Sequence, residues 1–357
     1  MFDYEIYKDR YFSLFACCLL VRGASRSLIC DVQRDIVHAI TNDLHDILIK
    51  NKSYTIEQLF DIYEPKNHKT LNYYFSFLLE NEYIFWCNSA EDLNLFPPIS
   101  MQYEDFRYIN NAIIDYNKTS KYSIESVVKE LDEFLCKAVE IRFYCDTLLE
   151  DIEQILICFR ETSIENIRIY LPYYDLTNKL IQEFLFQNIK IDFVCFHSSP
   201  EYKIQQLHQH SSTKVFYTQQ VITDNSHCGL IIPEYFACNL SMISESFNHN
   251  TCLNRKISID ADGNIKNCPS MVKNYGNLRD ITLKEAIEKQ GFKQMWTIHK
   301  DQIEVCKDCE FRHICTDCRA YIQDPANIYS KPAKCSYNPY TATWGEENPT
   351  DNSLYGK

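Results

Sequence analysis

The chain has 357 residues, a length that predicts two or three domains. Hydrophobic residues make up 45% of the sequence and aromatic residues 14%, which is enough for a sizeable core and excludes a disordered chain. Acidic residues outnumber basic ones by 49 to 36, and no basic run suggests a nucleic-acid-binding surface. Nucleic acid is therefore not an expected partner.

No apolar run approaches the roughly 18 residues of a membrane-spanning helix. The run LFACCLLV is shorter and follows a segment of mixed charge, so it predicts a buried strand rather than a signal peptide. We therefore expect a cytoplasmic protein without a membrane partner. The 17 cysteines then need a role other than disulfide bonding, because the cytosol is reducing.

Residues 11–87 predict strands followed by helices. The apolar runs FSLFACCLLV and SLICDV are joined by RGASR, which favours a turn, so a hairpin is expected, with QRDIVHAI as its third strand. Three helical patterns follow at residues 42–49, 55–63 and 70–80, and Thr55 with Gln58 forms a candidate capping box. YIFWC closes the segment as a strand. This order predicts a winged-helix-like module over residues 1–95.

The two prolines of EDLNLFPPIS indicate a linker, and beyond it strand and helix patterns alternate. The predicted strands are RYINNAIIDY, VEIRFY, NIRIYL, KIDFVCF, KVFYT and GLIIP. Strands that alternate with helices of this length indicate βαβ units and a parallel sheet. The predicted fold class is α/β, with a partial (β/α) barrel or an open parallel sheet over residues 100–245.

The last segment, residues 248–345, is dense in cysteine and weak in apolar periodicity. Its seven cysteines are Cys252, Cys268, Cys306, Cys309, Cys315, Cys318 and Cys335. An Asp-Gly turn at residues 262–263 predicts a hairpin that brings the first two together. Because the predicted core of this segment is small, we expect bound metal to contribute to its folding free energy.

Two kinds of metal site fit these cysteines. Zinc sites usually separate paired CxxC units by about a dozen residues or more, whereas five residues separate Cys309 from Cys315. Seven cysteines also do not divide evenly into four-cysteine zinc sites. Iron–sulfur clusters accept compact and interleaved ligand sets. The spacing therefore favours iron–sulfur clusters and leaves zinc as the alternative.

The pattern resembles the SPASM domain, the auxiliary-cluster domain at the C-terminus of many radical-SAM peptide maturases. Its signature is C-x9–15-G-x4-C, then C-x2-C-x5-C-x3-C, then a final C. The positions that match are Cys252, Gly263, Cys268, Cys306, Cys309 and Cys315. Cys318 departs from the signature, because two residues rather than three separate it from Cys315.

The resemblance implies two iron–sulfur clusters of the 4Fe-4S type. One would be held by Cys306, Cys309, Cys315 and Cys335, and the other by Cys252, Cys268 and Cys318. The fourth position of the second cluster would be open, or filled by Cys238, His249 or a peptide thiol. Arg312 and Arg319 would either offset cluster charge or lie on the surface.

A radical-SAM enzyme also carries CxxxCxxC after its first barrel strand and a GGE-type element on the next strand. Here the corresponding loop IIDYNKTSKYS contains no cysteine, and VEIRFYCD contains no glycine. We therefore expect no S-adenosylmethionine and assign no catalytic residue. The polar stretch HQH at residues 208–210 predicts a loop rather than a metal site.

Over nearly its whole length the chain resembles the SPASM-domain proteins of grasp-with-SPASM peptide-modification systems. The stretches LFACCLLVRGASRSLICDVQRD and CKDCEFRHICTDCRAY carry this resemblance. It implies two partners, a ribosomally made precursor peptide and an ATP-grasp ligase that forms side-chain ester or amide links. The N-terminal module is similar to peptide-recognition elements, in which a leader peptide adds as a strand to the hairpin edge beside the third helix.

The predicted function is therefore to bind the precursor peptide and assist its modification by the ligase. One alternative is a redox enzyme that modifies the peptide with its own clusters. A zinc-binding scaffold is another, and a plain winged helix that is structural or binds DNA is the alternative for the N-terminal module.

Overall fold

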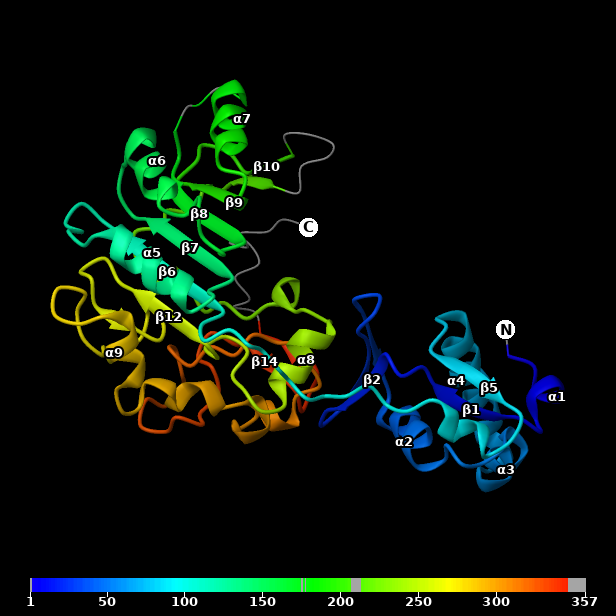
Figure 1. The fold of residues 1–357 in the computed structure, drawn as a ribbon. Coiled ribbons are helices and arrows are strands. Elements are labelled where there is room, and N and C mark those ends of the chain that lie inside the picture. The colour runs from blue at the N-terminus through cyan, green and yellow to red at the C-terminus, as the bar shows by residue number, and fades with distance from the viewer. Residues whose placement is uncertain (1, 175, 177, 207–212, 346–357) are drawn as a thin grey trace.

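The computed structural model describes residues 2–174, 176, 178–206 and 213–345, so the HQH stretch lies outside the described residues. Figure 1 shows an N-terminal module that projects from a larger body built on one sheet. None of the described helices is both long and apolar enough to cross a bilayer.

The N-terminal module follows the predicted order of strands and helices. Its elements are α1 (Tyr4–Tyr7), β1 (Tyr11–Leu14), β2 (Cys18–Arg22), β3 (Ser27–Asp31), β4 (Ile36–Ile40), α2 (Asn42–Lys50), α3 (Ile56–Ile62), the 3₁₀ helix η1 (Pro65–Asn67), α4 (His68–Glu80), β5 (Ile84–Cys87) and the 3₁₀ helix η2 (Asp92–Leu95). The capping box of Thr55 and Gln58 is confirmed at the start of α3. Strands β2, β3 and β4 form an antiparallel sheet, as the hairpin prediction requires.

The first apolar run forms two strands instead of one. β1 pairs with β5 in a separate antiparallel sheet, and the chain turns at residues 15–17 before β2 begins. Two backbone bonds fix this turn, from the Phe15 N–H to the Tyr83 carbonyl (3.0 Å) and from the Cys18 N–H to the Phe15 carbonyl (2.9 Å). The division lets Phe12 pack against Phe75 of α4 in the core of the module.

A large, mostly parallel sheet confirms the predicted α/β class. Its strands and helices are β6 (Asn111–Tyr116), α5 (Ile124–Glu133), β7 (Ala138–Phe143), α6 (Leu149–Ile157), β8 (Asn166–Pro172), α7 (Asn178–Gln187), β9 (Ile191–His197), β10 (Lys203–Gln206) and β11 (Lys214–Tyr217), joined by β12 (Lys256–Ile259) and β13 (Ile265–Lys266). The strand order is β10-β11-β9-β8-β7-β6-β12-β13, and only the two outermost pairs are antiparallel.

Strand β12 therefore extends the sheet from within the cysteine-rich segment, pairing parallel with β6. Ile257 and Ile259 of β12 enter the same core as Ile114 of β6 and Val139 of β7. The core of the cysteine-rich segment is thus partly shared with the sheet, which its weak periodicity did not indicate.

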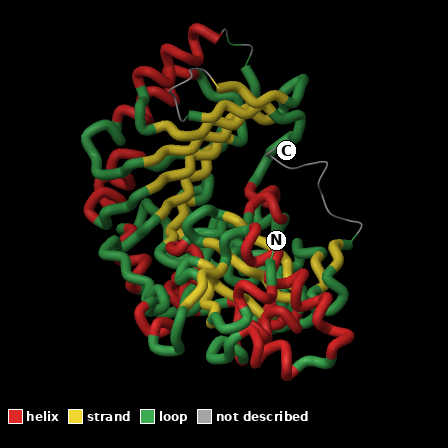
Figure 2. The backbone as a smooth tube through the Cα atoms, turned by 90° about the vertical axis from the view of Figure 1, so that its right-hand side faces the viewer, coloured by secondary structure: helices red, strands yellow, loops and turns green. Residues whose placement is uncertain are grey.

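The two faces of the sheet differ in chemistry. Helices α5, α6 and α7 cover one face of the sheet, and Figure 2 shows this layer of helices beside the strands. These helices contribute Val127, Ile152 and Ile181 to the apolar core. The opposite face carries a buried ion pair between Asp115 of β6 and Arg142 of β7, with Arg142 Nε 2.6 Å from Asp115 Oδ1. A buried charge is tolerated only when paired, so these two residues depend on each other.

The chain between β11 and the end contains mostly short elements. They are the 3₁₀ helices η3 (Asn225–His227) and η4 (Pro233–Tyr235), α8 (Leu240–Ser246), α9 (Leu283–Glu288), the 3₁₀ helices η5 (Phe292–Thr297), η6 (Lys300–Gln302) and η7 (Cys306–Asp308), and the strands β14 (Tyr337–Asn338) and β15 (Thr343–Trp344). The prediction of a strand at GLIIP was wrong, because Gly229 has a φ of 87° and Pro233 starts η4.

The β2–β3 hairpin joins the two parts of the molecule. The contacts of its tip with the cysteine-rich segment are Ala24 N–H to Asp308 O (2.8 Å), Arg312 Nη1 to Arg22 O (2.6 Å), Arg26 Nε to Glu310 Oε1 (2.6 Å) and Ser25 Oγ to Pro339 O (2.8 Å). Glu310 is fully buried and immediately follows Cys309. The hairpin tip therefore docks on the loop that carries the central cysteines.

Gly23 gives a test of this docking. A Cβ at Gly23 would lie 2.6 Å from the Arg26 carbonyl oxygen and 2.8 Å from the Glu310 nitrogen, both backbone atoms that cannot move independently. We expect Gly23→Ala to lower the free energy of unfolding by about 1–3 kcal/mol, measured by chemical denaturation. Gly345→Ala, whose nearest contact is an ordinary 3.4 Å, is the control and should have little effect. Equal stability of both variants would contradict the docking.

Candidate metal centres

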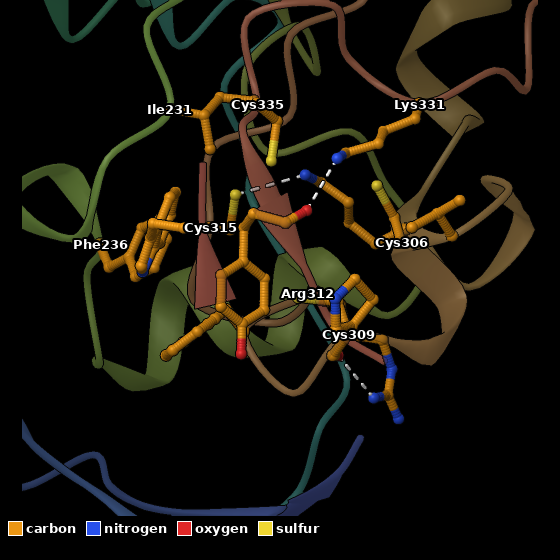
Figure 3. Close-up of a pocket in the computed structure, with 14 residues that line it drawn as sticks. Ile231, Phe236, Cys306, Cys309, Arg312, Cys315, Lys331 and Cys335 are labelled. Atoms are coloured by element: carbon orange, nitrogen blue, oxygen red, sulfur yellow. Dashed lines mark hydrogen bonds between the residues drawn. The ribbon is translucent and has the colours of Figure 1, made fainter. Parts of the chain in front are cut away.

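Four of the predicted cysteines line one pocket. Cys306, Cys309, Cys315 and Cys335, here named the first thiol group, surround a space of about 370 Å³ that is partly open to solvent. Figure 3 shows them arranged around this space. Cys306 is the first residue of η7 and Cys309 follows its end. The next turn brings Cys315 back through a bond from its N–H to the Phe311 carbonyl (3.0 Å). The segment with the CxxC-x5-C pattern therefore turns back on itself.

The remaining three predicted cysteines lie together with a fourth that sequence reasoning did not single out. Cys228, Cys252, Cys268 and Cys318 form the second thiol group. The thiols of Cys228 and Cys252 lie within electrostatic reach of each other and of those of Cys268 and Cys318. The β12–β13 hairpin brings the ends of its flanking segments, Cys252 and Cys268, together as its Asp-Gly turn predicted.

Cys238 and His249, the other two candidates for the fourth position, make contacts outside the second thiol group. The Cys238 thiol donates to the Ile36 carbonyl (3.6 Å) in the N-terminal module, and the His249 ring packs against Tyr103 with centroids 5.6 Å apart. Among these candidates and Cys228, only Cys228 interacts electrostatically with Cys252, Cys268 and Cys318 in the described residues. The cysteine signature does not include Cys228, because this residue precedes it in an irregular segment and has no CxxC partner.

The separation of the sulfur atoms bears on the choice of metal. Thiolates that bind one tetrahedral zinc ion at ~2.3 Å lie about 3.8 Å apart. Within the described residues, no three sulfur atoms of either thiol group all lie within 4.8 Å of one another. An iron–sulfur cluster holds its thiolates farther apart than a single zinc ion does, because each thiolate binds a different iron atom. The donor set, four cysteines in each group, also fits such a cluster.

A buried lysine lies against the first thiol group. Lys300 Nζ donates to Cys315 Sγ (3.3 Å) and lies 3.8 Å from Asp317 Oδ1. Asp317 also pairs with Arg319 Nε (2.9 Å), and all three charged residues are almost completely buried. Arg319 is thus a buried partner of Asp317 rather than a surface residue, whereas Arg312 binds the backbone of Arg22.

A second lysine lies against the second thiol group. Lys256 Nζ donates to Cys252 Sγ (3.5 Å) from the first position of β12. Among the described residues Lys256 forms no ion pair with a carboxylate, and the thiols of Cys252, Cys268 and Cys228 act on its charge more strongly than Glu140 does. A cation in this position stabilises an anionic metal–thiolate centre.

Burial also determines the protonation of the thiols. It raises the pKa of Cys268 and of Cys315 to about 12, and that of Cys318 to about 11. Without a metal these thiols are neutral at pH 7. Metal binding must release their protons, which makes occupancy dependent on pH.

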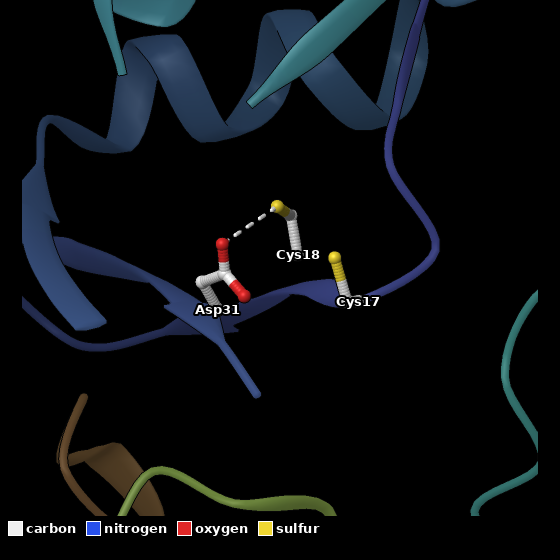
Figure 4. Close-up of side chains that lie close together, drawn as sticks. All are labelled: Cys17, Cys18 and Asp31. Carbon is white, nitrogen blue, oxygen red and sulfur yellow. Dashed lines mark hydrogen bonds between the residues drawn. The ribbon is translucent and has the colours of Figure 1, made fainter. Parts of the chain in front are cut away.

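A third set of ligand atoms lies in the N-terminal module. Figure 4 shows Cys17, Cys18 and Asp31, whose ligand atoms lie within 4.8 Å of one another. Asp31, however, already accepts bonds from the backbone N–H groups of Gln33 and Arg34 and pairs with Arg34 Nε (2.5 Å). Its carboxylate is therefore committed to the β3–β4 turn.

Comparison with known proteins supports the cluster interpretation. Residues 251–310 match the SPASM family, described as an iron-sulfur cluster-binding domain. This segment is therefore similar to a class of domain that binds iron–sulfur clusters. No curated protein matches the chain.

Two crystal structures of SuiB from Streptococcus suis resemble the fold. The structure bound to S-adenosylmethionine has 11% identity and a TM-score of 0.36, and the alignment covers 90% of this chain and 98% of that one. The structure bound to precursor peptide SuiA has 10% identity and a TM-score of 0.34, with the same coverage. Likeness at this level carries no conclusion about this chain.

Metal analysis tests the two thiol groups. We expect anaerobically purified protein to contain about eight irons and as many sulfides per chain, with absorbance at about 400 nm, because each group would hold a four-iron cluster. One or two zinc ions in a colourless protein, even after anaerobic reconstitution, would contradict this expectation.

Cys309→Ala tests the first thiol group separately. The variant should lose iron from the first cluster only, because one iron of that cluster loses its thiolate ligand. Cys195→Ala, at a buried cysteine in β9, is the matched control and should retain the full iron content. Equal losses in both variants would point to general unfolding instead.

Proposed function

We propose that the chain is a peptide-maturation protein that binds a ribosomally made precursor peptide and assists its modification by an ATP-grasp ligase. The observation that carries the proposal is the docking of a strand-and-helix module onto a SPASM domain, through the hairpin tip and Glu310. The sequence lacks the CxxxCxxC motif of radical-SAM enzymes, which favours an assisting role. In this proposal the clusters mainly hold the SPASM domain together.

The edge of β4 is the proposed leader-binding site in a winged-helix-like module. Among the described strands, β4 pairs only with β3, which leaves the backbone groups of its other edge for a peptide strand. The third long helix, α4, lies beside it, since the His38 ring meets Phe77 edge-on at 5.7 Å and Thr41 Oγ1 bonds to Tyr74 Oη (2.7 Å). Exposed Ile36 adds an apolar contact.

A redox enzyme that modifies the peptide by itself is the second candidate. The position of the second thiol group favours this candidate. Lys256 on β12 lies within electrostatic reach of the thiols of that group and also of Glu140 on β7. The polar face of the sheet, with Asp115 and Arg142, therefore adjoins a candidate cluster. A substrate on that face would be close to an electron donor.

Reconstitution separates the two candidates. We expect a precursor peptide and its ATP-grasp ligase to react with ATP faster when this protein is added, with the product mass expected for loss of water. Protein and precursor without ligase should give no mass change. A new mass from that pair, measured after anaerobic reduction, would favour the redox enzyme, and an unchanged ligase rate would contradict the assisting role.

Hydrogen exchange tests the leader-binding edge. In the full chain, leader peptide should slow amide exchange in β4 by about tenfold or more, because a paired edge loses its solvent-exposed amides. The edge strand β10 is an internal control and should not change. Protection that falls elsewhere while β4 stays unchanged would place leader binding at another surface.

A further inference from the structure

The second thiol group contains Cys228, which lies before the region matched by the SPASM family at residues 251–310. We propose that Cys228 is the fourth ligand of the second iron–sulfur cluster, which makes that cluster site closed and all-cysteine. This inference rests on the proposed iron–sulfur clusters but not on the peptide partner or the ligase. It assigns a ligand where the signature leaves an open position.

The backbone around Cys228 is fastened to the segments that carry the other ligands. Asn225 Nδ2 donates to the Pro269 carbonyl (3.2 Å) and Ser270 Oγ donates to the Asn225 carbonyl (2.9 Å), next to Cys268. On the other side, Lys334 Nζ donates to the Cys228 carbonyl (2.7 Å), and Lys334 is adjacent to Cys335 of the first thiol group. Bonds from both directions hold η3 and Cys228 at the thiol group.

Gly229 shows how closely this segment approaches the other ligands. Its φ of 87° is one that residues with a side chain rarely adopt, and a Cβ would lie 2.8 Å from Cys318 Sγ and 3.0 Å from the Tyr321 ring. Only glycine lets the backbone next to Cys228 pass this near to the Cys318 thiol. The same glycine explains why GLIIP does not form the predicted strand.

Charge supports the same assignment. Four thiolates and a cluster carry net negative charge, and Lys256 lies within reach of Cys228, Cys252 and Cys268. Each thiol group then consists of four cysteines and one lysine, since Lys300 has the same place beside Cys315. A closed site leaves no iron free to bind a peptide thiol or S-adenosylmethionine. The second cluster would then stabilise the fold or transfer electrons.

Spectroscopy of Cys228→Ala in the full chain tests the proposal. After anaerobic reconstitution and mild oxidation, we expect the variant to lose one iron from the second cluster and show the paramagnetic signal of a three-iron cluster by EPR. The wild type, with two oxidised four-iron clusters, should be silent. Cys238→Ala is the matched control, because Cys238 is another buried cysteine outside both thiol groups, and it should match the wild type.

Added thiol gives a second readout that does not require the variant to be stable. In the reduced wild type, 2-mercaptoethanol should leave the EPR spectrum unchanged, because no iron has an open position. In Cys228→Ser it should change the spectrum of one cluster. A shift in the wild type, or iron content and spectra of Cys228→Ala equal to wild type, would overturn the assignment. A wild type with zinc and no iron would overturn the clusters themselves, whereas a failed ligase assay would leave this assignment intact.

Discussion

Two groups of four thiols, each next to a lysine, are the constraint on which the C-terminal half depends. The thiols come from positions 228 to 335, and the segments between them contain few regular elements. Burial raises the pKa of Cys268 and Cys315 to about 12, so these thiols stay neutral until a bound metal displaces their protons. Metal is therefore expected to be part of the fold, and the convergence of the thiols positions Glu310, the residue that receives the N-terminal hairpin.

The docking of the hairpin connects that constraint to the N-terminal module. Glu310 accepts from Arg26 Nε and from Tyr337 Oη, so one fully buried carboxylate ties the hairpin and β14 to the loop of the first thiol group. Breaking one partner of a buried pair leaves an uncompensated charge, which is costly. An apolar contact supports the pair, since Leu28 and Cys30 of β3 share a core with Ile314. Placement of the module and order in the thiol loop are thus linked.

Local patterns predicted much of this structure, and contacts distant in sequence account for the differences. The periodicity of apolar residues and the capping residues, such as Thr55, predicted the positions of the helices. The alternation of strands and helices predicted the parallel sheet. The signature found seven of the eight grouped cysteines. Cys228 stayed hidden because its role depends on the bend at Gly229, which no periodicity records. Likewise, the break between β1 and β2 depends on pairing with β5, more than 60 residues away.

The register of the sheet explains why the second thiol group lies where it does. Successive side chains of a strand point to opposite faces, so the pairing of Ile257 with Ala112 sends Ile257 and Ile259 into the helix-covered core and leaves Lys256 on the other face. Cys252, four residues earlier, enters the thiol group from the same side and receives the lysine's hydrogen bond. A slip of one residue would place Lys256 among the helices and the isoleucines on the buried polar face with Asp115 and Arg142. Hydrophobic burial in the sheet therefore fixes the cation at the candidate cluster.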